Sequence, residues 1–393
     1  MIPSRFVGRD AARARFGARV DRLATFLSES DPLADAVVLA LAALPPGEGF
    51  RLFSECAAKG VDAVPLAPDA LRAFFHETEQ TPAWFDPVRA ERGRRVFLRY
   101  GPLAGIVLGG RSLILGYVSP AGNKPLVFSG RLAAQAPRRL AETGRFVQAI
   151  AEPHGTDVGA EGYQITLKVR IMHAQVRRMI ELSGKWRPAE WGRPINQHDM
   201  AGTTLLFSLA VIDGLRSLGA RIDRQEADDY VHLWRVIGRL MGVSAELLPA
   251  CEADAIALAE VIAATQAPPD DDARALTSAL LRVPHEEATT PIERLLARPR
   301  AALGGAVTRH LLGAELADEL GVPSTPLSAA LPLLRGVTRA RELVHAIAPG
   351  RRERAVDAGL AYWRGVVARA LRGRPTGFQP PEGLRGVPRP GPA

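Results

Sequence analysis

Apolar residues recur along this chain at the three- and four-residue spacings of an amphipathic α-helix. No set of segments alternates between apolar and polar residues in the way that strands do. The pattern therefore predicts an all-α protein, with one large helical domain over residues 1–372. The predicted helices cover residues 8–29, 31–43, 47–59, 68–79, 86–99, 102–117, 132–152, 162–183, 199–218, 224–241, 244–265, 270–282, 289–315, 326–346 and 352–371.

Several residues mark where these helices begin and end. Asp223 and Glu226 have the spacing of a capping box, which would open the helix at 224–241. Gly184 and Gly242 suit the left-handed position after a helix C-terminus. Three polar segments interrupt the helical pattern around its centre, and ordered polar loops are where binding groups usually lie. They are residues 119–131, 152–162 and 185–199.

The composition is that of a globular protein with an ample core, since 47% of residues are hydrophobic and the mean hydropathy is zero. Ala, Leu and Arg dominate, which favours helices. The tail at 373–393 is rich in Pro and Gly and is predicted to be disordered. If the chain has two lobes instead of one domain, the boundary is expected near 266–271, QAPPDD.

The charge pattern narrows the classes of partner. The net charge is +8, but no compact Lys/Arg block is interleaved with aromatic residues, so nucleic acid is not an expected partner. Cys56 and Cys251 form no spaced motif, which argues against a disulfide framework or a zinc site. The first residues lack the apolar core of a signal peptide, and runs such as 36–44 are too short to span a bilayer. A cytoplasmic protein is predicted, and peripheral contact with a membrane surface is compatible with this composition; nothing in the sequence predicts the oligomeric state.

The most informative segment is GYQITLKVRIMHAQVRRMIELSG, residues 162–184. It is apolar almost all round, yet Arg170, His173 and Arg177 fall within about 60° of arc on one face. Buried unpaired charges are costly, so something anionic should face the two arginines. A haem would satisfy all three residues, with its iron at His173 and its propionates at Arg170 and Arg177. The alternative is that the arginines pair with buried carboxylates such as Asp199 or Asp229, and the spacing does not decide between the two.

These residues also carry a family resemblance. The pattern Arg170-x-x-His173-x-x-x-Arg177 resembles the haem helix of the MpaB and latex-clearing protein (rubber oxygenase) family. Other matches follow in the same order and extend the resemblance over roughly residues 70–370. They are Pro194–Asp199 (PINQHD), Tyr230–Gly242 (YVHLWRVIGRLMG), Leu311–Gly313, Ala317-Asp318 and Leu320–Pro323 (LGVP).

The resemblance implies a globin-like helical core with extra helices and a b-type haem. It makes His173 the iron ligand and places Arg170 and Arg177 at the propionates. On the distal side the family carries Arg-x-x-Lys-Thr, 30 residues before the haem histidine. Here Arg139 and Thr143 match, but Glu142 replaces the lysine. A glutamate in this place would bring negative charge near the iron and could accept a proton.

A second departure lies in the preceding loop. The family's catalytic glutamate falls about 50 residues before the haem histidine, where this chain has Asn123. Cleavage of rubber itself is therefore not expected. The competing interpretation of Arg139 and Glu142 is an ordinary exposed i,i+3 ion pair.

Three functions remain open at this stage. The first is a haem-b-dependent oxygenase that uses dioxygen on an apolar or aromatic small molecule, with Arg139, Glu142 and Thr143 as distal groups. The second is a haem-binding sensor or carrier without oxygenase turnover. The third is a haem-free helical module that binds an apolar ligand.

Overall fold

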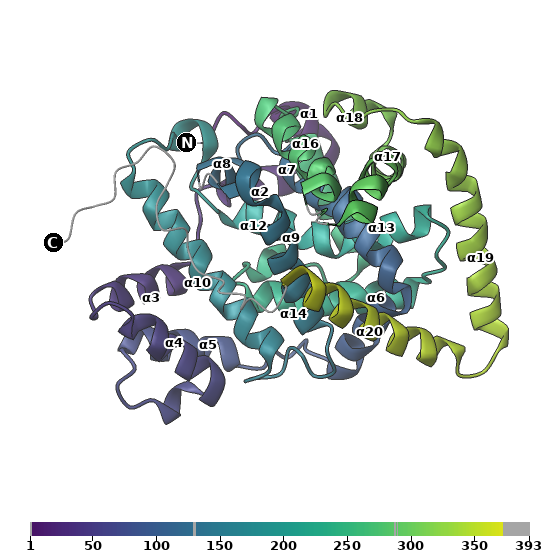
Figure 1. Ribbon diagram of the computed structural model, residues 1–393. Helices are drawn as coiled ribbons and strands as arrows, with labels where there is room; N and C mark the ends of the chain where they lie inside the picture. Colours follow the sequence, from purple (N-terminus) through teal and green to yellow (C-terminus); the bar gives the residue numbers. More distant parts are fainter. Residues whose placement is uncertain (1, 129–130, 287, 289, 372–393) are drawn as a thin grey trace.

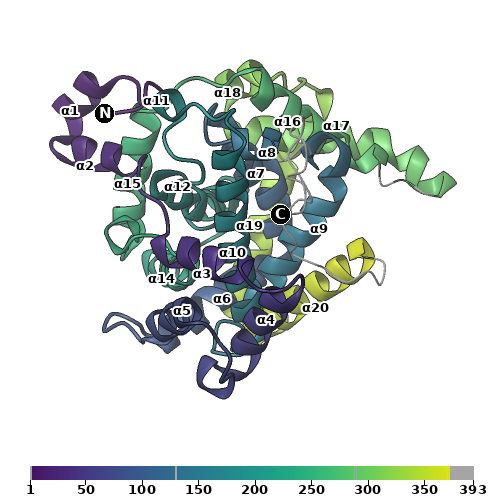
Figure 2. The same cartoon turned by 90° about the vertical axis from the view of Figure 1, so that its left-hand side faces the viewer.

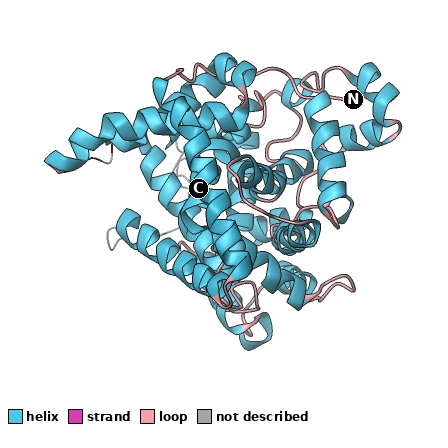
Figure 3. Ribbon diagram, turned by 90° about the vertical axis from the view of Figure 1, so that its right-hand side faces the viewer, coloured by secondary structure: helices cyan, strands magenta, loops and turns pink. Residues whose placement is uncertain are grey.

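The computed structural model describes residues 2–128, 131–286, 288 and 290–371, and within them every regular element is a helix (Figure 3). The only β feature of this part is an isolated bridge between Phe6 and Gln266. The all-α prediction is confirmed. The α-helices are α1 Arg9–Phe16, α2 Arg19–Thr25, α3 Pro32–Ala42, α4 Glu48–Lys59, α5 Asp69–Glu79, α6 Pro87–Val107, α7 Leu113–Val118, α8 Lys124–Phe128, α9 Arg131–Ile150, α10 Glu161–Leu182, α11 Pro188–Trp191, α12 Gln197–Phe207, α13 Leu209–Ser217, α14 Arg224–Leu240, α15 Glu252–Ala264, α16 Asp271–Glu286, α17 Pro291–Leu312, α18 Ala314–Glu319, α19 Leu331–Ile347 and α20 Arg351–Leu371. Four shorter turns are η1 Val61–Ala63, the π-helical η2 Leu108–Ser112, η3 Ala245–Leu247 and η4 Pro326–Ala330.

Most predicted boundaries agree with these helices to within a few residues. The capping box of Asp223 and Glu226 is present, and Gly184 and Gly242 have the expected positive φ. The predicted helix at 8–29 is instead divided at Gly17, whose φ is +68°. Two predicted loops contain short helices, α8 in 119–131 and α11 in 185–199, which local composition did not reveal. The predicted disordered tail at 373–393 lies outside the described residues.

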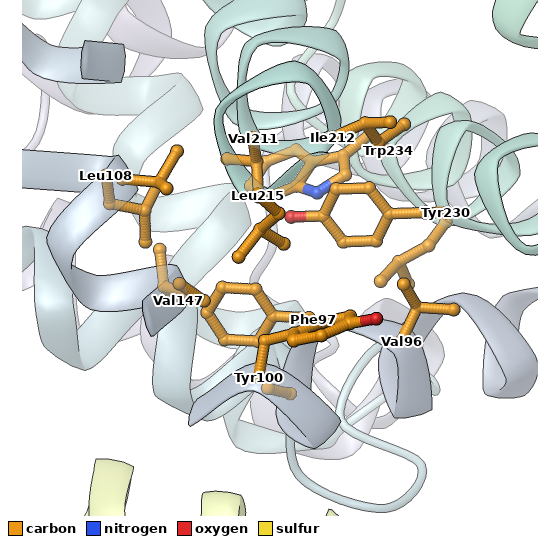
Figure 4. Close-up of a cluster of buried hydrophobic side chains, with 14 of the residues drawn as sticks. Val96, Phe97, Tyr100, Leu108, Val147, Val211, Ile212, Leu215, Tyr230 and Trp234 are labelled. Atoms are coloured by element: carbon orange, nitrogen blue, oxygen red, sulfur yellow. The ribbon is translucent and has the colours of Figure 1, made fainter. Parts of the chain in front are cut away.

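Helix α6 lies at the centre of the molecule, between α14 and α20 (Figure 1). Gly93 allows the approach of α14, because a Cβ at this position would lie 2.3 Å from the carbonyl oxygen of Asp229. On the other side, a Cβ at Gly359 of α20 would lie 1.8 Å from the carbonyl oxygen of Leu98. A kink at Gly101, followed by Pro102, turns the helix toward η2 and α7. The largest hydrophobic cluster surrounds α6, and Figure 4 shows its aromatic centre with residues from α6, α9, α13 and α14.

Helix α10 joins this centre to the N-terminal helices. It packs against α9, α14, α3 and α4, and Figure 2 shows α3, α4 and α5 close to it, with α1 and α2 further away. Tyr163, Leu167, Ile171 and Ala174 of α10 are buried in a second hydrophobic cluster with residues of α3, α4 and α5. The helix therefore has hydrophobic neighbours on both sides, as its nearly uniform apolar composition predicts.

The continuous segment Pro87–Val118 is long and apolar enough to cross a membrane by length and composition. The central helix of a globular protein passes the same test. The packing of α6 between α14 and α20 accounts for its apolar character.

We expect Gly93→Ala to lower the free energy of unfolding by ~1–3 kcal/mol, because α6 and α14 must separate to admit the methyl group. Urea denaturation followed by circular dichroism measures the change. Gly304→Ala in α17 is the matched control, since no atom lies within 4 Å of its added Cβ. It should leave stability unchanged or increase it. Equal stability of the two variants would show that the α6–α14 contact tolerates separation.

Candidate functional site

Arg170 projects from α10 into a fully protein-lined environment. Its Nε and Nη2 atoms donate to the two carboxylate oxygens of Asp31, at 2.6 and 3.0 Å, and both side chains are buried. The Nη1 atom donates to Thr78 Oγ1 at 3.3 Å. The guanidinium also lies over the ring of Phe74. Gly242 leaves the room for this pair, because a Cβ there would lie 2.2 Å from Asp31 Oδ2.

Arg177 lies two helical turns further along α10, and its guanidinium is likewise hydrogen-bonded within the protein. Its Nη1 atom donates to Asp35 of α3. Its Nε and Nη2 atoms donate to the carbonyl oxygens of Pro194, at 3.1 Å, and Ile195, at 3.0 Å. The side chain is among the largest that are fully buried in the described part of the chain.

These contacts change the electrostatic argument made from the sequence. The anionic groups expected opposite Arg170 and Arg177 are carboxylates of the protein itself, Asp31 and Asp35. The two carboxylates are four residues apart, at the start and in the first turn of α3, so they share one face of that helix. The alternative of internal carboxylate partners therefore describes the observed structure.

The carboxylates named in that alternative have other partners. Asp199 accepts two hydrogen bonds from Arg5, at 2.8 and 2.7 Å. Asp229 pairs with Arg89 and Arg92, at 3.1 and 2.6 Å. Their assignment to Arg170 and Arg177 was wrong, because spacing along the chain does not show which segments meet across the fold.

His173 differs from its two neighbouring arginines. Its Nδ1 atom is buried and has no hydrogen-bond partner in the described part of the chain. Burial, followed by the positive charge of Arg177, lowers the pKa of His173 to about 4. The imidazole is therefore neutral at pH 7, which is the form that binds metals. A buried ring nitrogen without a partner is costly unless something outside the protein satisfies it.

Two charged groups on neighbouring helices act on the same imidazole. Arg139 of α9 also lowers the pKa of His173, whereas Asp31 raises it. Arg139 similarly opposes the rise in the pKa of Tyr117 that burial causes. The structure thus brings Arg139 into electrostatic range of both His173 and Tyr117. Tyr117 was not predicted, because nothing near it in the sequence links α7 to α9.

The other two distal residues lie on α9 as predicted, but their surroundings differ from those of Arg139. Glu142 accepts a hydrogen bond from Arg138 at 3.0 Å, in an i,i+4 pair. The predicted alternative was a pair of Glu142 with Arg139, and the structure gives Glu142 an ion pair with Arg138 on the same helix. Thr143 is half-buried on the same helix.

Asn123, which stands where the family has its catalytic glutamate, is completely buried. Its Nδ2 atom donates to the carbonyl oxygen of Tyr117 at 3.0 Å and to Asp270 Oδ1 at 3.4 Å. A glutamate could make neither bond at neutral pH, because a carboxylate has no proton to donate. Asn123 therefore ties the 119–124 loop to the end of α7.

No three His, Cys, Asp or Glu side chains converge on a metal site anywhere in the part of the chain that the structure describes. A metal ion at His173 would have to bring most of its ligands with it, as iron does in a porphyrin.

A separate cavity of about 350 Å³ lies under the N-terminal segment and contains none of the predicted site residues. Its lining includes Arg5, Phe6, Lys124, Trp191 and His198.

We expect Asp31→Ala and Arg170→Ala each to lower the free energy of unfolding by ~3–5 kcal/mol, because each leaves an unpaired buried charge. The double variant should lose less than the sum of the two. Urea denaturation of all three measures this coupling. Arg187→Ala, which breaks an exposed i,i+3 pair with Glu190, is the control and should change stability little. A double variant whose loss equals the sum would contradict the pairing.

The comparisons with known proteins agree with this fold. Residues 95–348 match the family model described as ER-bound oxygenase mpaB/B′/rubber oxygenase, catalytic domain. The rubber oxygenase of Streptomyces sp. (strain K30) is 28% identical over 279 residues, which cover 68% of this chain and 65% of that protein. The solved structure of latex clearing protein LCP in the closed state covers 86% of this chain and 91% of its own, with a TM-score of 0.67 and 23% identity. The protein therefore belongs to the mpaB/rubber oxygenase family of oxygenases.

Proposed function

We propose that this protein is a haem-b-dependent oxygenase that acts on an apolar or aromatic small molecule with dioxygen. The observation that carries the proposal is His173, a neutral imidazole on α10 with a buried ring nitrogen that has no partner in the described protein. An iron held in a porphyrin would satisfy that imidazole with a single protein ligand. Membership in an oxygenase family supports the reaction class.

His173 would hold the iron, and haem b, when bound, supplies a redox-active iron that reacts with dioxygen. Arg139 contributes a fixed positive charge within range of His173, which favours negative charge that develops during oxygen reduction. Glu142 and Thr143 share the face of α9 that carries Arg139, and we propose them as further distal groups. The pairing with Arg138 holds the carboxylate of Glu142 in place.

The propionates of haem are not assigned to Arg170 and Arg177 in this proposal, although the family resemblance places them there. Every nitrogen of both guanidiniums already donates to a protein acceptor. Breaking such a buried pair would leave Asp31 or Asp35 without its partner. The arginines serve the site indirectly, because they fix α3 against the turns of α10 on either side of His173.

The substrate class comes from the relatives and from two departures in this chain. The similar protein from Streptomyces is named for rubber, an apolar polymer, and this chain spans 65% of its length. Asn123 and Glu142 replace the glutamate and the lysine that the resemblance leads one to expect. We therefore propose an apolar or aromatic small molecule and not rubber.

One observation favours a second candidate, the haem-free helical module. Asp31 and Asp35 neutralise both arginines inside the protein, so the charge of α10 does not require a cofactor. The unpartnered imidazole of His173 still favours the haem protein.

Expression with a supply of haem tests the proposal. The purified protein should show a Soret band, and His173→Ala should remove or greatly weaken it, because the iron loses its protein ligand. His76→Ala, on the exposed side of α5, is the matched control and should keep the band. A wild-type protein without a Soret band would favour the haem-free module. A band that His173→Ala leaves unchanged would refute the ligand assignment. Oxygen consumption with terpenoid or aromatic compounds then separates an oxygenase from a carrier.

A separate experiment tests the role of the arginines. It compares the binding of haem with that of haem dimethyl ester, whose esterified propionates carry no charge. We expect Arg170→Ala to weaken the affinity for both compounds by the same factor, because its effect passes through α3. Absorbance titration measures the two affinities, with Arg187→Ala as the control. A loss of affinity for haem alone would place a propionate at Arg170, as the family resemblance implies.

A further inference from the structure

Helix α19 exposes its apolar side chains. It forms an outer edge of the molecule, at the right of Figure 1, and packs only against η4 and α20 among its principal helix contacts. Leu333 is 71% exposed and Ile347 is 81% exposed. Val337, Leu343 and Val344 are exposed as well. Contiguous apolar surface of this kind usually marks an interaction site.

The opposite side of α19 faces the protein and carries both apolar and polar residues, since Leu331 and Leu334 pack against the main hydrophobic cluster. Thr338 and Glu342 are only 8% and 4% exposed. Glu342 accepts a hydrogen bond from the hydroxyl of Tyr100 at 3.0 Å. Gly219 admits the helix backbone, because a Cβ there would lie 2.7 Å from the carbonyl oxygen of Arg335. The helix is thus attached to the core by Leu331, Leu334, Thr338 and Glu342, while a second set of apolar side chains stays exposed on its opposite face.

The exposed residues form one continuous stripe. Leu333, Val337, Ala340, Val344 and Ile347 follow each other at spacings of four and three residues and fall within about 80° of arc. Over the 17 residues of α19 the stripe is ~25 Å long. We call these five residues the α19 stripe.

Positive charge borders the stripe on both sides. Arg339 and Arg341 are exposed and lie on opposite sides of the stripe, and neither forms an ion pair within the described residues. Exposed Arg351 and Arg354 follow at the start of α20. The acidic residue of α19, Glu342, faces the core and not the stripe.

The arginines beside the α19 stripe indicate which kind of surface could cover it. Two copies of α19 packed through such a seam would bring arginines into like-charge contact along its edges. A lipid surface instead accepts the apolar stripe between the headgroups and attracts the flanking arginines when its lipids are anionic. We propose that the α19 stripe lies in the plane of an anionic membrane surface, with Arg339 and Arg341 at the lipid headgroups.

Flotation of the full-length protein with lipid vesicles tests this proposal. The protein should float with vesicles that contain equal parts of phosphatidylcholine and phosphatidylglycerol, and much less with phosphatidylcholine alone. Arg339→Gln and Arg341→Gln should each weaken partitioning about fivefold, since one arginine near an anionic surface contributes about 1 kcal/mol. The triple change Val337→Asn, Val344→Asn and Ile347→Asn should weaken it tenfold or more. These side chains are exposed, so circular dichroism should show an unchanged fold.

Two matched variants serve as controls. Leu66→Asn with Leu182→Asn removes equally exposed apolar side chains elsewhere on the surface and should float like the wild type. Ile292→Asn with Leu295→Asn removes the exposed apolar residues of α17 and should retain most of the binding.

Three results would overturn the proposal. One is a wild-type protein that does not float with either vesicle. Another is binding that the α17 variant abolishes and the α19 variants leave unchanged. The third is a dimer in light scattering that the triple stripe variant converts to a monomer, without any flotation, which would make a second copy of the chain the occupant.

Discussion

The buried ion pair between Arg170 and Asp31 is the interaction on which the arrangement of the site depends. It joins residues that are 139 positions apart, and Arg177 with Asp35 repeats it two turns along α10. Neither helix could keep its position without the other, because each separated charge would remain buried and unpaired. The pairs therefore fix the rotation of α10 about its axis, and with it the direction in which His173 points. Gly242 is part of the same constraint, since any side chain there would occupy the place of the Asp31 carboxylate.

His173 lies between two neutralised arginines and so has a distinct chemistry. Their charges are balanced by Asp31 and Asp35, yet Arg177 and Arg139 still help burial to keep the imidazole neutral. A neutral imidazole without a hydrogen-bond partner at its buried nitrogen is suited to a metal that brings its other ligands. The same helix thus combines two structural arginines with the histidine that we propose as the iron ligand.

Asn123 and Tyr117 connect the loop after α7 to the surroundings of Arg139. Asn123 uses its amide to hold the end of α7, where a carboxylate could not donate. Tyr117, at that end, lies within electrostatic range of Arg139. The loop, α7 and α9 are therefore linked by the hydrogen bond from Asn123 and by the charge of Arg139 near Tyr117. If the α19 stripe rests on a membrane, the protein would also be placed where apolar compounds accumulate.

The sequence by itself determined the helical class, most helix boundaries and the family, because these depend on local periodicity, caps and short motifs. It also singled out Arg170, His173 and Arg177, since charge on an apolar helix is visible in the pattern alone. Only the tertiary structure decided what the arginines contact. Asp31 and Asp35 look like ordinary residues at the start of α3, and Tyr117 like an ordinary core aromatic. The exposed apolar stripe of α19 was hidden for the same reason: the pattern shows where apolar residues recur on a helix, but the packing of the whole chain decides which of them are buried.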